Sequence, residues 1–181
     1  MMTTMGTIYI KRVLAILFCL VNTTLFSQEA NYGREDLILA AKELMESAGY
    51  CALITLDDEG RARVRVMDPF GPEDDLTVWF GTNSESRKVV QIKADPRVTL
   101  YYFDSDATGY VMIHGIATMV DDNVEIEKHW KESWEDFYPN KSRYTLIKVI
   151  PDWMEIVSIS RGIIGDSITW KPPVVQLNIK N

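Results

Sequence analysis

The sequence predicts a mostly β protein, an antiparallel barrel that is closed or half-closed and carries helices on its outside. About seven β-rich segments follow one another, most of them joined by short turns. The few helical segments do not alternate regularly with the strands, which disfavours a doubly wound parallel sheet. The 181 residues, 46% hydrophobic and 25% charged, suit one globular domain with a core of its own.

The first half of the domain is expected to form a helix followed by a hairpin. Residues 34–48 repeat apolar side chains at helical spacing and are followed by Gly49, which is typical of an amphipathic helix and its end. Residues 50–56 are apolar and β-rich. Turn residues at 57–60 separate them from 61–67, where arginine alternates with small apolar residues. The two strand-like segments therefore predict a β-hairpin.

The rest of the chain is expected to add further helices and strands. Helical spacing predicts helices at 84–94 and 121–137, the first ended by Asp95-Pro96. The tail after Trp170 contains two prolines and is expected to be extended. β-rich composition predicts strands at 76–80, 97–103, 110–120, 143–150 and 154–159.

The first 27 residues have the order of a secretory signal peptide. A basic pair at 11–12 precedes an apolar run at 13–21, and polar residues lead to Ser27. We therefore expect a signal peptide at 1–27 and a mature domain at 28–181, in an exported protein that is periplasmic or secreted. A buried N-terminal helix in a cytoplasmic protein is the alternative. No other apolar run is long enough for a stable membrane span after signal removal.

The composition argues against several function classes. A formal net charge of −7 repels phosphate backbones, so nucleic acid is not an expected partner. Two Cys and two His supply too few ligands for a zinc site, so no metal is expected. The sequence contains no G-x-G-x-x-G, G-x-S-x-G or H-E-x-x-H motif. No side chain stands out as a catalytic acid or base, and the catalytic residues remain unknown.

One constellation of residues indicates an anion site. Arg61, Arg63 and Arg65 are two residues apart on a predicted strand, so they share a face and repel one another unless an anion is present. Residues 81–88 then lead from a strand end into a helix start, which offers free backbone N–H groups and several hydroxyls. The segment ends in two cations, which oppose the helix dipole. A bound phosphate resolves both conflicts; a solvated strand face and an ordinary capped helix are the alternative.

Three segments in this order resemble the pyridoxamine 5'-phosphate oxidase-like flavoproteins, the FMN-binding split barrels, and especially their general stress protein subgroup. Arg65-Val66-Met67 resembles the family's Arg-x-Met or Arg-x-Val stretch beside the flavin. Phe80-Gly81-Thr82-Asn83 with Ser86-Arg87-Lys88 resembles the elements around the ribityl phosphate. Tyr110-Val111 before Gly115 resembles the strand that approaches the flavin from the partner subunit. The similarity covers nearly the whole mature chain.

The resemblance implies a six-stranded antiparallel split β-barrel with flanking α-helices. It also implies a homodimer with FMN bound at the interface. The same resemblance gives roles to the matching residues. The phosphate would be held by Arg65, Arg87 and Lys88, with help from Ser86. The ribityl and ring region would be lined by Thr82 and Asn83, the isoalloxazine would meet backbone groups and an apolar wall of Val66 and Met67, and Tyr110 would come from the partner subunit.

Departures from the oxidase itself argue against the oxidation of pyridoxamine phosphate. Asp68-Pro69-Phe70 stands where the oxidase has a lysine, and residues 162–170 contain neither Arg nor His. We therefore expect an FMN-dependent oxidoreductase that acts on another small-molecule substrate. A non-catalytic protein that holds FMN, a deazaflavin coenzyme or haem is the alternative. Trp153 and Trp170 are expected to pack rather than to cover a flavin.

Overall fold

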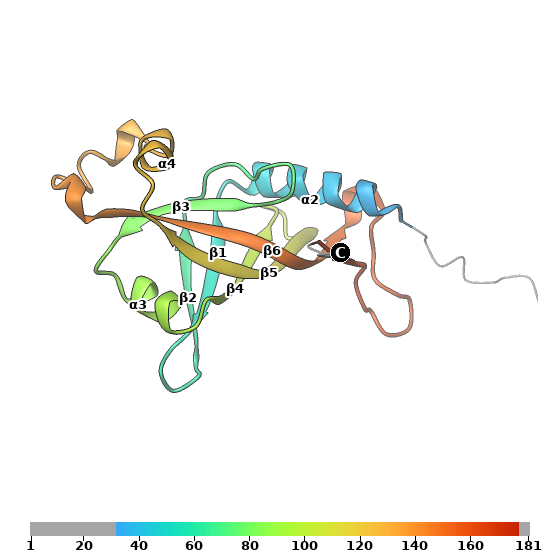
Figure 1. The fold of residues 1–181 in the computed structure, drawn as a ribbon. Coiled ribbons are helices and arrows are strands. Elements are labelled where there is room, and N and C mark those ends of the chain that lie inside the picture. Colours follow the sequence, from blue (N-terminus) through green and yellow to red (C-terminus); the bar gives the residue numbers. More distant parts are fainter. Residues whose placement is uncertain (1–31, 178–181) are drawn as a thin grey trace, which may run out of the picture. The chain divides into compact units, whose positions relative to one another are not determined.

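The fold is a curled antiparallel sheet in which six strands form a half-barrel (Figure 1). The computed structural model describes residues 32–177, so the expected signal peptide at 1–27 lies outside the described residues. The strand order is β2-β1-β4-β5-β6-β3, and β7 pairs with β6 beside this path. The strands are β1 (Cys51–Leu56), β2 (Ala62–Met67), β3 (Val78–Asn83), β4 (Arg97–Phe103), β5 (Gly109–Val120), β6 (Tyr144–Ser158) and β7 (Val174–Gln176).

The two ends of this strand order, β2 and β3, form the split of the barrel. Within residues 32–177 no ladder joins them, and they meet only through an isolated bridge between Pro69 and Phe80. The predicted six-stranded split barrel is therefore confirmed. The predicted hairpin is confirmed as well, because β1 and β2 pair antiparallel from Cys51 with Met67 to Leu56 with Ala62.

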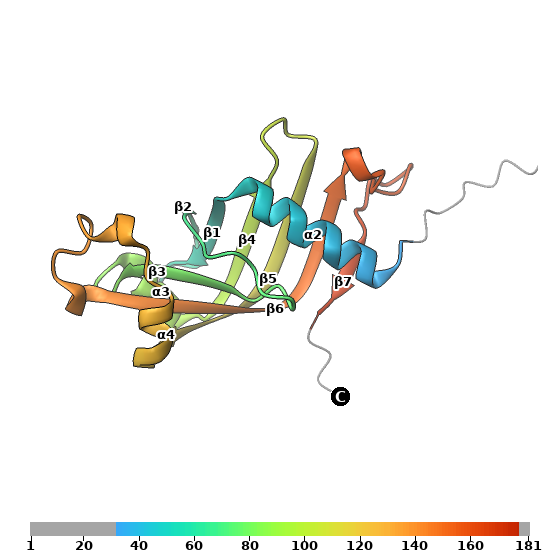
Figure 2. The ribbon, with the colours of Figure 1, turned by 90° about the horizontal axis from the view of Figure 1, so that it is seen from above.

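Within residues 32–177, three α-helices accompany the sheet: α2 (Arg34–Ala48), α3 (Arg87–Ala94) and α4 (Asn123–Lys128). α2 crosses the sheet and packs against β4, β5, β6 and β7 (Figure 2). It buries one face made of Leu37, Ala40, Ala41, Leu44 and Met45, as its periodicity predicts. α3 packs against β1 and β5. Among the described residues, no helix combines the length and apolar character that a membrane-spanning segment requires.

The sheet has an inner face toward the core and an outer face. Successive side chains of a strand alternate between faces, and directly paired residues share one. Leu53, Leu100 and Ile113 pair in sequence across β1, β4 and β5 and are fully buried, which defines the inner face. The outer face of β2, β4 and β5 carries apolar side chains that remain exposed, namely Val64, Val66, Phe103 and Ile116.

The connection between β5 and β6 differs from the single helix expected at 121–137. It consists of α4, the segment around His129, and a 3-10 turn at Glu132–Trp134. Trp134 is buried there in a second cluster with Trp79, Tyr144 and Leu146. Burial of these large aromatic side chains outweighs the helix propensity of the segment. The expectation of one continuous helix is therefore wrong.

β6 is one long strand where two strands were expected at 143–150 and 154–159. Pro151 lies inside it and pairs with Gly115 of β5, where the register shifts between His114 and Gly115. A Cβ on Gly115 would lie 2.6 Å from the carbonyl oxygen of Ile150. The bulge and the glycine thus let the ladder continue past a proline that usually ends a strand.

β3 and the C-terminal tail show smaller differences from the sequence-based expectations. The strand expected at 76–80 runs instead from Val78 to Asn83, because its last three residues pair with Leu146, Thr145 and Tyr144 of β6. The tail expected to be extended contains β7. Trp170 is 83% exposed and does not pack within residues 32–177, so its packing stays a prediction. Trp153 is half-buried, with its ring centroid 4.8 Å from that of His114.

Candidate functional site

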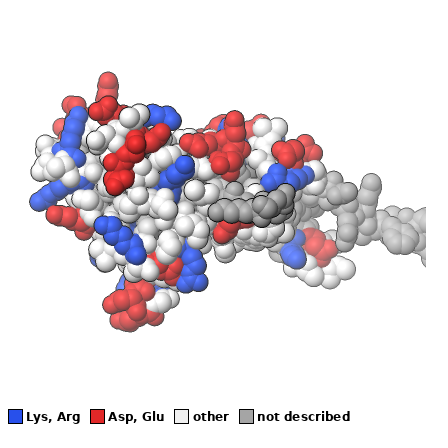
Figure 3. Space-filling model, viewed as in Figure 1, with Lys and Arg blue, Asp and Glu red and all other residues white. Residues whose placement is uncertain are grey.

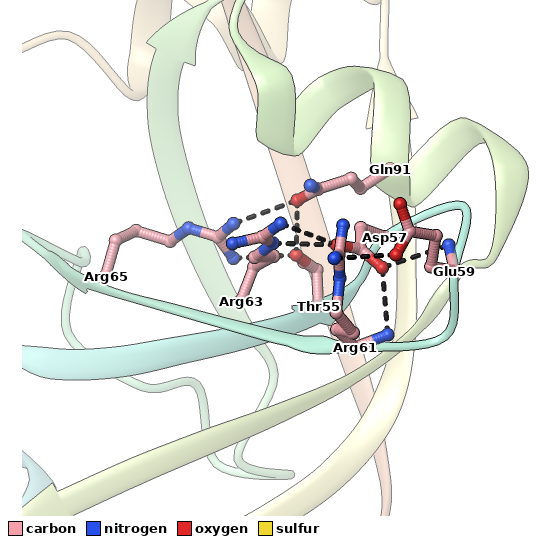
Figure 4. A network of polar contacts seen from close by, with 7 residues as sticks. All are labelled: Thr55, Asp57, Glu59, Arg61, Arg63, Arg65 and Gln91. Atoms are coloured by element: carbon pink, nitrogen blue, oxygen red, sulfur yellow. Dashed lines mark hydrogen bonds and ion pairs between the residues drawn. The ribbon is translucent and has the colours of Figure 1, made fainter.

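Arg61, just before β2, and Arg63, on β2, are neutralised by the turn that joins β1 to β2. Asp57 Oδ2 accepts hydrogen bonds from Arg61 Nε at 3.0 Å and from Arg63 Nε at 2.8 Å. The Asp57 side chain is only 7% exposed, and the three residues face one another across the hairpin (Figure 4). Asp57 is therefore the anion that the repulsion between Arg61 and Arg63 requires, and no ligand is needed there.

The hydrogen bonds to Asp57 also change its acidity. Burial alone would raise the pKa of this carboxyl group. The backbone and side chain of Arg61, the side chain of Arg63 and the backbone N–H of Glu59 outweigh that effect and lower the pKa to about 2. The carboxylate thus stays ionised and holds the hairpin turn together.

Arg65 is held by uncharged partners instead. It pairs with Leu53 across the hairpin, so its side chain lies on the inner face at the edge of the split. Nη1 donates to the carbonyl oxygen of Leu53 at 3.2 Å and to Thr55 Oγ1 at 2.8 Å. Nη2 donates to Gln91 Oε1 at 2.9 Å (Figure 4). Its positive charge therefore has hydrogen-bond partners but no counter-ion in the part of the chain that the structure describes.

The start of α3 brings two more cations to the same region. Arg87 and Lys88 occupy its first two positions, and Ser86 is the N-cap. The first turn contains no acidic residue, and the Ser86 side chain makes no capping hydrogen bond. Lys88 is half-buried and reaches β3, where Nζ donates to Thr82 Oγ1 at 2.8 Å. The helix start therefore carries positive charge where the helix dipole favours negative charge.

The charges of this cluster act on one another. The pKa of Lys88 is lowered by burial and by the nearby charge of Arg65. The pKa of Arg65 is lowered by burial and by the charge of Arg87. Within residues 32–177, none of these three cations forms an ion pair with a carboxylate. We call Arg65, Arg87 and Lys88, together with Ser86, the cation cluster.

The cation cluster fits a phosphate group. Ser86 Oγ is buried and has no hydrogen-bond partner in the described part of the chain, and a buried hydroxyl without a partner is costly. A phosphate would supply acceptors for this hydroxyl, for the cations and for the first N–H groups of α3. On the face drawn in Figure 3, acidic and basic side chains are interspersed, so the attraction for an anion is local.

A surface hollow of about 510 Å³ lies beside α3. Its lining includes Arg87, Val90 and Gln91, but also the four acidic residues Asp57, Asp58, Glu85 and Asp95. These carboxylates make the hollow unfavourable for an anion. A phosphate would therefore be favoured where α3 faces Arg65 and Lys88 rather than in this hollow.

The other predicted site residues are distributed over both faces of the sheet. Thr82 is buried and contacts Lys88, whereas Asn83 Oδ1 accepts from the backbone N–H of Glu85 and shapes the turn before α3. Met67 is 8% exposed and packs in the main core, while Val66 is 75% exposed on the outer face. The structure thus brings Thr82 to the cation cluster and separates Val66 from it.

Tyr110 lies on the outer face, away from the cation cluster of its own chain. It is paired with Phe103, and its ring stacks on Tyr101 at a centroid distance of 5.4 Å. Its hydroxyl donates to Glu155 Oε1 at 3.0 Å, and its pKa is raised to about 12 by burial and by this carboxylate. Tyr110 therefore meets the site only if a second subunit supplies it.

Sequence reasoning missed Thr55 and Gln91. Both contact Arg65, and Thr55 Oγ1 also donates to Gln91 Oε1 at 2.6 Å. A signal for Gln91 is present in the sequence, because it follows Lys88 by three residues and so lies near it on the helix surface. Thr55 gives no comparable signal, because its role depends on the hairpin register.

The fold and the site can now be compared with known proteins. A family model described as pyridoxamine 5'-phosphate oxidase like matches residues 37–158. The chain belongs to this family. Its members include FMN-binding proteins of the split-barrel fold, among them the Nostoc protein described next. No curated protein matches the chain significantly.

Three solved structures illustrate the likeness. A protein related to general stress protein 26, from Clostridium acetobutylicum, is 20% identical with a TM-score of 0.65, over 79% of this chain and 96% of that one. A pyridoxamine 5'-phosphate oxidase-related, FMN-binding protein from Nostoc punctiforme is 18% identical with a TM-score of 0.55, and the match covers 78% of this chain and 93% of that one. A heme binding protein from Mycobacterium smegmatis is 13% identical with a TM-score of 0.57, and the match covers 71% of this chain and 55% of that one. At these identities the likeness establishes the fold.

Proposed function

We propose that this protein binds FMN and acts as an oxidoreductase on a small-molecule substrate. The observation that carries the proposal is the cation cluster, three cations without a carboxylate partner in the described chain beside an unpaired buried hydroxyl. Membership of a family that includes FMN-binding proteins supports FMN over other phosphate esters. The departures noted in residues 68–70 and 162–170 argue against pyridoxamine phosphate as the substrate.

The chain's own residues bind and orient the cofactor. The phosphate would be held by the cation cluster, that is by Arg65, Arg87, Lys88 and Ser86. Thr82 would lie close to the phosphate because it accepts a hydrogen bond from Lys88. Asn83 at the turn and the backbone groups of Val66 and Met67 would follow along the ribityl chain and ring, because the Met67 side chain is buried in the core and the Val66 side chain lies on the outer face. When bound, FMN supplies the hydride chemistry, and the protein contributes position and electrostatics. This division of labour agrees with the lack of an evident acid or base.

We further propose a homodimer with the cofactor at its interface. The support is the apolar outer face, where Val64 and Val66 are 64% and 75% exposed and Phe103 is 56% exposed. Exposed apolar surface on neighbouring strands is typical of a protein–protein interface. Tyr110 lies on this face, so a second copy would bring it to the cofactor. Export as a periplasmic or secreted protein, after removal of residues 1–27, is part of the same proposal.

A second candidate is a protein that holds its cofactor without turnover. A phosphate-binding cluster serves a deazaflavin coenzyme as well as FMN, and one protein of similar fold is a heme binding protein. Steady-state reduction with nicotinamide donors separates the two candidates. A flavin that binds tightly but is never reduced and reoxidised would favour the second one.

The test is a comparison of two flavins that differ only in the phosphate. Residues 28–181 are purified and titrated with FMN and with riboflavin, and flavin fluorescence reports binding. We expect FMN to bind with a micromolar or lower Kd and riboflavin at least about 100-fold more weakly, since hydrogen bonds to a charged group contribute roughly 1.5–3 kcal/mol each. Arg65→Leu should remove most of this preference. Equal affinity for both flavins, or no binding at tens of micromolar FMN, would contradict the proposal.

A further inference from the structure

The hydrogen bonds around Arg65 leave one edge of its guanidinium group unused. Nη1 uses both of its hydrogens, on the Leu53 carbonyl and on Thr55 Oγ1, and Nη2 uses one on Gln91 Oε1. Thr55 Oγ1 and Gln91 Oε1 are 2.6 Å apart, so both lie on the edge that joins Nη1 and Nη2. Nε–H and the second Nη2–H have no partner among residues 32–177. These two donors form the fork that grips an oxyanion at two points.

The orientation of the Gln91 amide follows from the same contacts. Arginine only donates hydrogen bonds, so the Gln91 atom facing Nη2 is the oxygen. Thr55 Oγ1 accepts from Nη1, which leaves its own hydrogen for Gln91 Oε1. Both lone pairs of the amide oxygen are thus used, one by Thr55 and one by Arg65. The three mutual hydrogen bonds among Arg65, Thr55 and Gln91 therefore fix the orientation of the guanidinium plane.

All three acceptors around Arg65 are uncharged, in contrast to those around its neighbours. On the same face of β2, Arg61 and Arg63 share the carboxylate of Asp57. Gln91 instead provides an acceptor of similar size without the negative charge. The positive charge of Arg65 therefore remains available to a ligand, and the pKa of this residue reflects only burial and the charge of Arg87.

We infer that Gln91, supported by Thr55, is a positioning residue that aims the open edge of Arg65 at the cofactor phosphate without neutralising its charge. The inference rests on the proposed function and deepens it, because it assigns the preference for a phosphorylated flavin to a residue that does not contact the phosphate. Gln91 and Thr55 act through Arg65 alone.

Two substitutions at position 91 separate the effect of the hydrogen-bond acceptor from the effect of charge. Gln91→Glu keeps an oxygen in place for both hydrogen bonds but adds the charge that Asp57 supplies to Arg61 and Arg63. Gln91→Leu removes the acceptor and leaves Arg65 untethered on that side. Thr55→Val removes the hydroxyl with little change in shape. We expect all three to weaken FMN binding, and Gln91→Glu to do so although the protein is at least as stable.

The experiment measures Kd for FMN and for riboflavin in each variant, with thermal unfolding as the measure of folding. We expect Gln91→Glu to lower FMN affinity at least about tenfold while riboflavin affinity changes less than about twofold. Lys93→Gln is the matched control, since it makes the same change of net charge at an exposed position of α3 and should leave both affinities unchanged. An unchanged FMN-to-riboflavin ratio in Gln91→Glu and Gln91→Leu, or an equal loss for both flavins, would overturn the inference.

A second ligand separates this inference from the proposed function. Inorganic phosphate is added to wild type and variants, and the shift of the unfolding temperature is recorded. If wild type binds no flavin, the proposed function fails, yet stabilisation by phosphate in wild type and its loss in Gln91→Glu would still support the role of Gln91. Equal stabilisation of both proteins, or of neither, would overturn it.

Discussion

A single carboxylate organises the charges of the β1–β2 hairpin. Asp57 accepts from Arg61, Arg63 and two backbone N–H groups of its own turn, so one buried side chain both neutralises two cations and closes the turn. This arrangement leaves Arg65, two residues further along β2, without a counter-ion among residues 32–177. The position of Asp57 in the turn therefore determines that the positive charge of Arg65, rather than that of Arg61 or Arg63, is available to a ligand.

The low pKa of Asp57 predicts a specific pH dependence of stability. The folded pKa is about 2, below the value of about 3.9 for an unfolded Asp, so the folded state binds fewer protons. The stabilisation is therefore complete above about pH 5 and is lost as the pH falls toward 2. Asp57→Asn should lower the urea midpoint at pH 7, and the difference from wild type should shrink between pH 4 and pH 2.

The control for this experiment is Asp58→Asn, in the same turn. Asp58 is exposed and forms no ion pair within the described residues, so its replacement should change the midpoint little at any pH. A difference between Asp57→Asn and wild type that is the same at pH 7 and pH 2 would show that the ion pairs do not cause it.

Gly81 is a second residue whose surroundings predict an effect. A Cβ at this position would overlap the Trp134 ring and lie 2.6 Å from the Tyr144 ring. Both rings belong to a packed aromatic cluster with little freedom to move. We expect Gly81→Ala to lower the free energy of unfolding by about 1–3 kcal/mol, measured by urea unfolding with tryptophan fluorescence. Gly71→Ala, with nothing near its Cβ, should be close to neutral; equal effects would contradict the overlap.

Some individual residues of the candidate site could be predicted from the sequence. Alternation on a strand placed Arg61, Arg63 and Arg65 on one face. The hairpin register confirms this for Arg63 and Arg65, whereas Arg61 lies just before β2. Alternation did not reveal that Asp57 serves Arg61 and Arg63, because that contact depends on how the turn closes. Gln91 and Thr55 were missed for similar reasons. Gln91 contacts Arg65 only after α3 docks on β1, and Thr55 contacts it only once the β1–β2 register is formed.

At the scale of the element, α3 begins in a way that disfavours its own stability. Its first turn holds two cations and no acid, and its N-cap side chain makes no capping bond. Natural helices usually place acidic residues here because they complement the dipole. The departure is understandable if the first turn is built to receive an anion.

This interpretation predicts opposite effects on stability and binding. Arg87→Glu introduces an acid at the first helical position and removes a charge that lowers the pKa of Arg65. We expect the free protein to gain about 0.3–1 kcal/mol in unfolding free energy and FMN affinity to fall at least about tenfold. Urea unfolding and flavin titration measure the two effects. Lys93→Glu, in the last turn, should lower stability slightly and leave binding unchanged. Loss of both stability and binding in Arg87→Glu would contradict the interpretation.

Element boundaries were predicted well where local signals decide them. The range of α2 matches its periodicity and Gly49, and β2 and β4 match their alternation. The expectations failed at β6 and at the β5–β6 connection. A proline stays inside β6 because Gly115 of the neighbouring strand makes room, and Trp134 ends regular helix because it packs on β3. Both outcomes depend on residues far away in the sequence.

At the scale of the whole molecule, the two faces of the sheet differ in burial. The inner face and α2 form the main core, while the outer face leaves four apolar side chains of β2, β4 and β5 exposed. The cation cluster lies at the split, at the edge where β2 and α3 meet. In the proposed dimer, a second copy on the outer face would border the proposed phosphate site, and assembly would then be coupled to cofactor binding.

Val64→Asp tests this coupling, because Val64 is 64% exposed on the outer face, is not among the residues proposed to contact FMN, and its replacement should leave the folded monomer intact. A carboxylate placed in the middle of an apolar interface is left unpaired there, which costs several kcal/mol and should convert the dimer to a monomer. Light scattering after size-exclusion chromatography reports the mass, and flavin titration should show FMN affinity falling together with it. Val90→Asp is the matched control, since Val90 is 64% exposed on α3, outside the outer face, and should keep the wild-type mass. A dimer that survives Val64→Asp would place the interface elsewhere. A monomer that binds FMN as tightly as wild type would separate assembly from cofactor binding.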